Sequence, residues 1–171
     1  MTDAEKIWAS RDLRDENTEA LRYCNDVKHL DIGHCALKDY WFLEYMPNLE
    51  VLIISCGEVE DIMPISKYCH NLIFLEAAEC RIIDVSPIAD CASIEYLNIG
   101  GNNNIDPSTL SSLYSLPNLK RFYCENIYTY ENNMTEEQEK FEALHSDCEV
   151  DFSWNGDTAL NDTWRYTREL L

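Results

Sequence analysis

The amino-acid sequence predicts an α/β solenoid with a parallel sheet on its concave face and short helices or irregular segments on its convex side. The first observation is a change of apolar spacing within a short stretch, "CRIIDVSPIADCASIEYLNI". Ile82, Val85 and Ile88 lie three residues apart, whereas Leu97 and Ile99 lie two apart. Alternation by two indicates a strand with one buried face, and the wider spacing indicates a helical turn. The second observation is that this change recurs along the chain.

The repeat consists of four successive units of about 22 to 25 residues, a period typical of solenoids. The units are 27–48, 49–71, 72–93 and 94–118, and a fifth, partial unit begins at 119. The fourth position of each unit holds Leu30, Leu52, Leu75, Leu97 and Phe122. The sixth position holds Ile32, Ile54, Ala77, Ile99 and Cys124. We expect each of these positions to form one column of a common core, because a single repeat cannot bury its own apolar face.

The two ends of the stack are expected to be capped. We assign residues 1–26 to an N-terminal helical cap, 27–131 to the repeats, and 132–171 to a C-terminal cap. The C-terminal cap is predicted to contain a helix in "MTEEQEKFEALHS", an edge strand in "CEVDF" and a turn-rich tail, "SWNGDTALNDTWRYTRELL". Thr135 is expected to be the N-cap of the helix.

The pattern resembles the leucine-rich repeat family, in particular the short bacterial repeats of internalin-like proteins. Those repeats often carry D-[IV]-x-P-[IL] after the strand, and "DIMPI" (61–65) and "DVSPI" (84–88) match it. Their ninth position is usually Asn or Cys, and here it holds Cys35, Gly57, Cys80 and Asn102. The resemblance covers about residues 27–127 and implies a module that holds another protein on its concave sheet.

The charge of the chain restricts the class of partner. The 171 residues include 32 acidic and 13 basic side chains, which gives a net charge of −19. Phosphate backbones and anionic lipids repel such a surface, so we expect no nucleic acid partner and no membrane insertion. The charge is compatible with a basic protein partner, and we expect a monomer. The first residues carry no signal-peptide pattern, which leaves a cytoplasmic protein and a fragment of a secreted or surface protein as open interpretations.

Six of the eight cysteines are interpreted as core residues, and Cys148 is interpreted as a surface or junction residue after the last helix. The register places these six at inward positions, where free cysteine packs as a small apolar residue: Cys24, Cys35, Cys69, Cys80, Cys91 and Cys124. We therefore expect reduced thiols, no cofactor and no zinc site. The remaining cysteine is Cys56, at the outward eighth position, where neighbouring repeats place His34 and Glu79. That row gives one alternative function, a thiol-dependent enzyme or metal site.

The predicted binding surface comes from strand positions three and five, which point away from the core. Its residues are His29, Val51, Ile53, Phe74, Glu76, Tyr96, Asn98, Arg121 and Tyr123. We expect an exposed apolar and aromatic patch with charged surroundings, which is typical of binding hot spots. The chain is therefore predicted to be a non-catalytic protein-binding module. Two alternatives remain at this point: a structural spacer of a longer protein, and a patch covered by the tail through Trp154 and Trp164.

Overall fold

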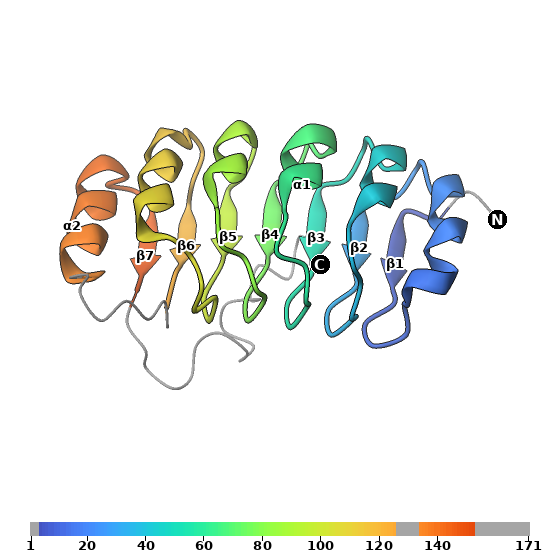
Figure 1. Ribbon diagram of the computed structural model, residues 1–171. Coiled ribbons are helices and arrows are strands. Elements are labelled where there is room, and N and C mark those ends of the chain that lie inside the picture. The colour runs from blue at the N-terminus through green and yellow to red at the C-terminus, as the bar shows by residue number, and fades with distance from the viewer. Residues whose placement is uncertain (1–3, 126–133, 153–171) are drawn as a thin grey trace.

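The computed structural model describes residues 4–125 and 134–152, and these residues form one parallel sheet of seven strands that follow the order of the chain (Figure 1). The strands are β1 (Lys6–Trp8), β2 (His29–Asp31), β3 (Val51–Ile53), β4 (Phe74–Glu76), β5 (Tyr96–Asn98), β6 (Arg121–Tyr123) and β7 (Glu149–Asp151). The helical segments all lie on one side of this sheet (Figure 1). They are the 3₁₀ helices η1 (Asp15–Tyr23), η2 (Trp41–Tyr45), η3 (Ser86–Asp90) and η4 (Pro107–Ser115), and the α-helices α1 (Met63–Tyr68) and α2 (Met134–Leu144).

The predicted columns are confirmed by the register of the sheet. Leu30 pairs with Leu52, Leu52 with Leu75, Leu75 with Leu97, and Leu97 with Phe122. All five are fully buried in one continuous hydrophobic core between the sheet and the helical side. The sixth-position column, from Ile32 to Cys124, lies in the same core. The chain therefore folds as a solenoid with the parallel sheet on its concave face.

The aspartates of the repeat motif begin the helical segments. The carboxylate of Asp61 accepts a hydrogen bond of 2.8 Å from the Met63 amide, and that of Asp84 accepts one of 2.8 Å from the Ser86 amide. Asp39 and Asp106 make the same contact with the residue two positions later. Such Asx turns favour helix entry, and a proline in the first helical turn has no amide hydrogen to leave unsatisfied.

Side chains at the end of each unit connect it to the preceding one. Asn48, Asn71 and Asn118 donate through Nδ2 to backbone carbonyls of the previous repeat, over 3.2, 3.0 and 2.9 Å. Ser93 donates in the same way to the carbonyl of His70 over 3.2 Å. These bonds satisfy carbonyl groups that the short helical segments leave free.

The eighth position adopts a left-handed backbone in each repeat whose turn lies within the described residues. The φ angles are 68° at Arg11, 58° at His34, 58° at Cys56, 53° at Glu79 and 72° at Gly101. The amide of each of these residues donates to a carbonyl of the next repeat, as in the 2.8 Å bond from Cys56 to Ala78. The repeat therefore requires this conformation at each of these five turns, although only the last of them has glycine, the residue best suited to it.

The ninth-position side chains bond to the repeat before them. Cys35 and Cys80 donate through Sγ, each over 3.2 Å, to the sixth-position carbonyl of the preceding repeat, Ala9 or Ile54. Asn102 makes the equivalent bond to Ala77 over 2.8 Å. All three of these side chains are buried. The thiols of Cys35 and Cys80 therefore act as weak hydrogen-bond donors at the position where the fourth repeat has the side-chain amide of Asn102.

Gly57 interrupts this column for a steric reason. A Cβ atom at Gly57 would lie 2.9 Å from the carbonyl oxygen of Ile54 and 3.2 Å from the Tyr40 hydroxyl. The buried Tyr40 side chain therefore takes the space that a ninth-position side chain would use. Burial raises the pKa of Tyr40 far above its usual value, with the neighbouring thiols of Cys80 and Cys35 adding to the effect.

The two ends of the stack depart from the sequence prediction in detail. The N-terminal region contains a strand, β1, in addition to the expected helical segment, and Ile7 pairs with Leu30 in the fourth-position column. At the other end, α2 begins at Met134, so the prediction that Thr135 is its N-cap is wrong. The edge strand expected in "CEVDF" is present as β7. Within the described residues, no helix combines the length and apolar character needed to cross a membrane.

Candidate functional site

The sheet has a second hydrophobic cluster on the face opposite the main core. It consists of Val51, Ile53, Phe74 and Tyr123, with Tyr96 packed against them, and we call it the concave cluster. Because successive side chains of a strand point to opposite faces, Leu52 and Leu75 enter the main core while their neighbours project away from it. The structure therefore brings together the five apolar residues that the sequence predicted to lie on one surface.

The expectation that this patch is exposed is wrong. Phe74 retains 0%, Val51 3% and Ile53 4% of its accessible surface, and only Tyr96 is half-buried. The Phe74 and Tyr96 rings lie 6.2 Å apart, a distance at which aromatic rings attract each other. Sequence periodicity could assign the face of the sheet for each residue, but it contains no information on what lies above that face. The proposed cover by Trp154 and Trp164 falls outside the described residues.

Two polar residues of the predicted surface, Glu76 and Asn98, are also buried beside the cluster. The carboxylate of Glu76 accepts a 2.8 Å hydrogen bond from Ser55 Oγ, and that hydroxyl accepts a bond from the Ala78 amide. Asn98 Oδ1 accepts from the Gly100 amide over 3.0 Å, but its buried Nδ2 has no hydrogen-bond partner among the described residues. An unsatisfied buried amide is costly, so this donor favours an acceptor above the sheet.

His29, at the N-terminal end of the face, is a second residue with buried polar atoms that are not hydrogen-bonded to any described residue. Both ring nitrogens are buried and lack hydrogen-bond partners within the described part of the chain. Burial lowers the pKa of His29, Lys6 lowers it further, and Asp31 acts in the opposite direction. The neutral ring that results at neutral pH can donate one hydrogen bond and accept another.

Trp8 extends the face and was missed in the sequence analysis. Its ring lies 5.4 Å from that of His29, and 63% of the residue is exposed. Trp8 pairs in register with Asp31, so it occupies the fifth strand position of a repeat that precedes the four recognised ones. The signal was the alternation around Ile7 in "KIW", which is too short to stand out by itself.

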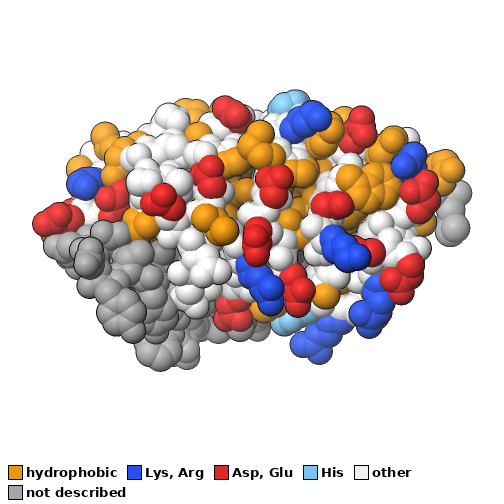
Figure 2. Space-filling view, viewed as in Figure 1, with side chains coloured by type: hydrophobic (Ala, Val, Ile, Leu, Met, Phe, Trp, Pro, Cys, Tyr) orange, Lys and Arg blue, Asp and Glu red, His pale blue; other side chains and the backbone are white. Residues whose placement is uncertain are grey.

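Two basic side chains at the C-terminal end of the sheet are paired with carboxylates. Lys120 Nζ lies 2.7 Å from Glu95, and Arg121 Nε lies 2.8 Å from Glu149. Glu149 also accepts a hydrogen bond of 2.9 Å from the Tyr123 hydroxyl. Acidic side chains are also spread over the helical side, among apolar ones (Figure 2).

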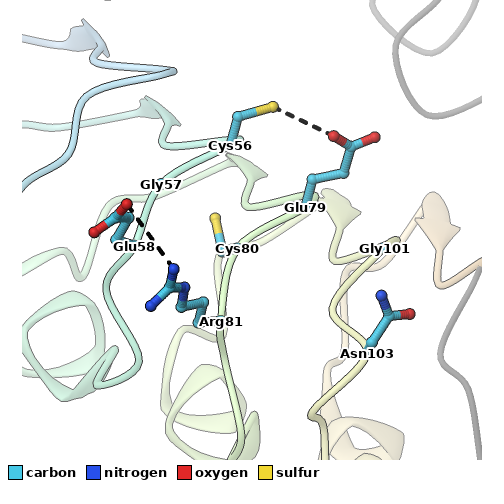
Figure 3. Close-up of a pocket in the computed structure, with 8 residues that line it drawn as sticks. All are labelled: Cys56, Gly57, Glu58, Glu79, Cys80, Arg81, Gly101 and Asn103. Carbon is cyan, nitrogen blue, oxygen red and sulfur yellow. Dashed lines mark hydrogen bonds and ion pairs between the residues drawn. The ribbon is translucent and has the colours of Figure 1, made fainter.

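The row around Cys56 is only partly assembled. Cys56 Sγ donates to Glu79 Oε2 over 3.5 Å, and the two side chains point toward each other at the edge of an open cleft of about 510 Å³ (Figure 3). Arg81 in the same cleft lies 3.9 Å from Glu58. The ring of His34 is exposed and takes part in none of the hydrogen bonds among the described residues.

Among the described residues, the Cys56 sulfur has the Glu79 carboxylate as a hydrogen-bond partner. Thiol catalysis uses an imidazole or a cation to produce the thiolate, and the ring of His34 makes no hydrogen bond to this sulfur. In the described part of the chain, no three His, Cys, Asp or Glu side chains are arranged to hold a metal ion. His34, Cys56 and Glu79 share a row because the repeat places its left-handed turn at that position.

Cys56 should nevertheless be the cysteine that reacts first with alkylating reagents among those at repeat positions. It is partly exposed, whereas Cys69, Cys80 and Cys91 are buried. Burial raises the pKa of Cys69 to about 12 and the pKa values of Cys80 and Cys91 to about 11. A thiol with a pKa near 11 is about one thousandth ionised at pH 8. Brief alkylation followed by mass mapping checks this, and labelling in denaturant is the control.

Equal labelling of Cys80 and Cys56 in the folded protein would contradict the register. Cys24 was also assigned to the core, and the structure packs it against the core but leaves it partly exposed. Burial raises its pKa too, so its labelling is expected to be intermediate. The other five cysteines assigned to the core are buried as predicted.

Comparison with solved structures identifies the fold as that of leucine-rich repeat proteins. An internalin of Listeria monocytogenes (InlF) matches with a TM-score of 0.60 and 20% identity over 78% of this chain and 37% of its own. Internalin C2 of the same organism matches with a TM-score of 0.59 and 17% identity, over 85% of this chain and 69% of its own. The Arabidopsis receptor kinase HAESA, solved with the peptide hormone IDA and the co-receptor SERK1, matches with a TM-score of 0.57 and 16% identity.

These similarities concern the fold and only part of each neighbour. The chain spans about a third of InlF, and its match to HAESA covers 71% of this chain and 22% of the receptor. No protein-family model and no curated protein matches the sequence.

Proposed function

We propose that this chain is a non-catalytic protein-binding module that holds a segment of a partner protein on its concave face. The observation that supports this most strongly is the concave cluster, an apolar and aromatic group separate from the main core. The main core already joins the sheet to the helical side, so the solenoid itself does not require a second cluster. Aromatic side chains surrounded by polar groups are the usual composition of binding hot spots.

The polar groups around the cluster indicate the chemistry of the partner. The buried Asn98 Nδ2 and the ring of His29 can bond to a peptide backbone that runs across the strands. The carboxylate of Asp31 on the face and the net charge of −19 favour a partner with basic side chains. The HAESA structure supports the general mode, because that leucine-rich repeat neighbour was solved with a peptide hormone.

The two alternative functions have less support. The Cys56 row lacks the imidazole contact that a thiol enzyme needs, and its geometry follows from the turn. A spacer needs only a polar, solvated sheet face, and an apolar cluster on that face is unfavourable in such a role.

Selection from a displayed library of random short peptides tests the proposal. The full chain, immobilised, should enrich peptides that combine Arg or Lys with an aromatic residue. Tyr96→Asp, at the half-buried edge of the concave cluster, should reduce the binding of the enriched peptides at least tenfold, because it introduces a charge among apolar side chains.

The matched control is Ile83→Asp, which makes the same kind of change at a residue that is 48% exposed and lies outside the sheet. It should leave peptide binding unchanged. Absence of enrichment above the bare support would contradict the proposed function. An equal loss in both variants would show that the peptides bind somewhere other than the concave face.

A further inference from the structure

The concave cluster is buried, yet it lies on the side of the sheet that faces away from the helices. All helical segments of the described residues are on the other side (Figure 1). Neighbouring side chains on one face of a sheet shield each other only partly, so exposures between 0% and 4% at Phe74, Val51 and Ile53 require a layer above them. The occupant of the face must therefore be a segment that supplies apolar surface.

The C-terminal segment 153–171 is close enough to be this occupant. It follows β7, which is the edge strand of the sheet and pairs with β6. Adjacent strands lie about 4.8 Å apart, so the distance from β7 across the sheet to β3 is roughly 20 Å. An extended chain with the length of 153–171 spans up to roughly 60 Å, which is ample for crossing the cluster.

The apolar composition of the segment matches that of the face. It offers large apolar and aromatic side chains: Trp154, Leu160, Trp164, Tyr166, Leu170 and Leu171. Its two basic residues, Arg165 and Arg168, lie near its end, and its three acidic residues are Asp157, Asp162 and Glu169. A buried carboxylate such as that of Glu76 is stabilised by positive charge and by hydrogen-bond donors, and an arginine supplies both.

We propose that segment 153–171 binds in cis to the concave cluster, with Trp154 or Trp164 against Phe74 and Tyr96. A consequence follows that rests on the proposed function: a partner must displace the segment before it can bind to the concave face. The segment then acts as an intramolecular competitor that lowers the apparent affinity of the face for any peptide.

Photocrosslinking in the full chain tests the placement of the segment. Trp164 is replaced by the photoreactive residue p-benzoylphenylalanine, the protein is irradiated at low concentration, and the crosslinks are mapped by mass spectrometry. We expect crosslinks within one molecule to residues of β3 to β6 that face the concave side. The same replacement at Ile83 is the control and should give no crosslinks to those residues.

Two outcomes would overturn the proposal. Crosslinked dimers would show that a second copy of the chain covers the face. Crosslinks to the helical side, or none at all, would show that the segment does not bind the concave cluster.

A charge variant separates this proposal from the proposed function. Arg165→Glu with Arg168→Glu should weaken the contact of the segment and raise the binding of enriched peptides several-fold. Crosslinks could form on the face while no peptide binds to the unchanged chain or to the charge variant. The segment would then be a permanent cover, and only the proposed function would be contradicted. Peptides could instead bind equally to the unchanged chain and to the charge variant, with no crosslinks to the face. Only the proposal about the segment would then be contradicted.

Discussion

Replacing Leu75 by alanine should lower the free energy of unfolding by about 3 kcal/mol, within the range of 2 to 5 that large-to-small changes cause in cores. Leu75 is fully buried and pairs in register with Leu52 on one side and Leu97 on the other. Truncation leaves a cavity between neighbouring repeats, and the main-chain bonds on both sides limit how far the repeats can close it. Equilibrium unfolding in urea measures the change.

Phe74→Ala provides a matched comparison at the adjacent residue. Both side chains are fully buried, but Phe74 belongs to the concave cluster and Leu75 to the main core. We expect Phe74→Ala to cost less stability than Leu75→Ala, although phenylalanine is the larger side chain, because the solenoid does not depend on the layer above the sheet. An equal or larger loss would show that the concave cluster is a second core and would remove the basis of the binding proposal.

Much of the fold could be predicted from the sequence because the repeat reports the same structure several times. One alternation such as that of Leu97 and Ile99 is ambiguous, but the agreement of four units in register is not. β1 was missed because "KIW" is a single short alternation without the rest of the motif. Cys24 is less buried than predicted for a related reason: it lies in the terminal cap, where one neighbouring repeat is absent.

The candidate site could be predicted only in part. Strand alternation is a local property, so it assigned Phe74, Tyr96 and Asn98 to one face of the sheet. Their burial depends on contacts between segments distant in the chain, and no spacing rule encodes such contacts. The row of His34, Cys56 and Glu79 shows the opposite error: their shared position in successive repeats was predicted correctly, but it results from a common turn conformation, and the printed side-chain contact joins only Cys56 and Glu79.

Asn102→Ala should lower the free energy of unfolding by about 3 kcal/mol or more, although it removes only a small polar group. Asn102 Nδ2 donates to the carbonyls of Ala77 and Ile99 over 2.8 and 2.7 Å, and Oδ1 accepts from the Ile82 amide over 3.3 Å. Each backbone group left without a partner in the interior costs about 1 to 3 kcal/mol. Two of the three belong to the preceding repeat, so the substitution weakens the contact between two repeats.

Two controls isolate the contribution of the amide. Asn103→Ala, at the exposed neighbouring residue, should change the stability by less than about 0.5 kcal/mol, as surface substitutions usually do. Cys80→Ala, at the equivalent position of the third unit, should cost less than Asn102→Ala. A thiol has one weak donor, which Cys80 directs at Ile54 and Ala78 over 3.2 and 3.5 Å, whereas the amide of Asn102 makes three bonds. If Cys80→Ala were as damaging as Asn102→Ala, filling the space at the ninth position, and not hydrogen bonding, would be the property that joins the repeats there.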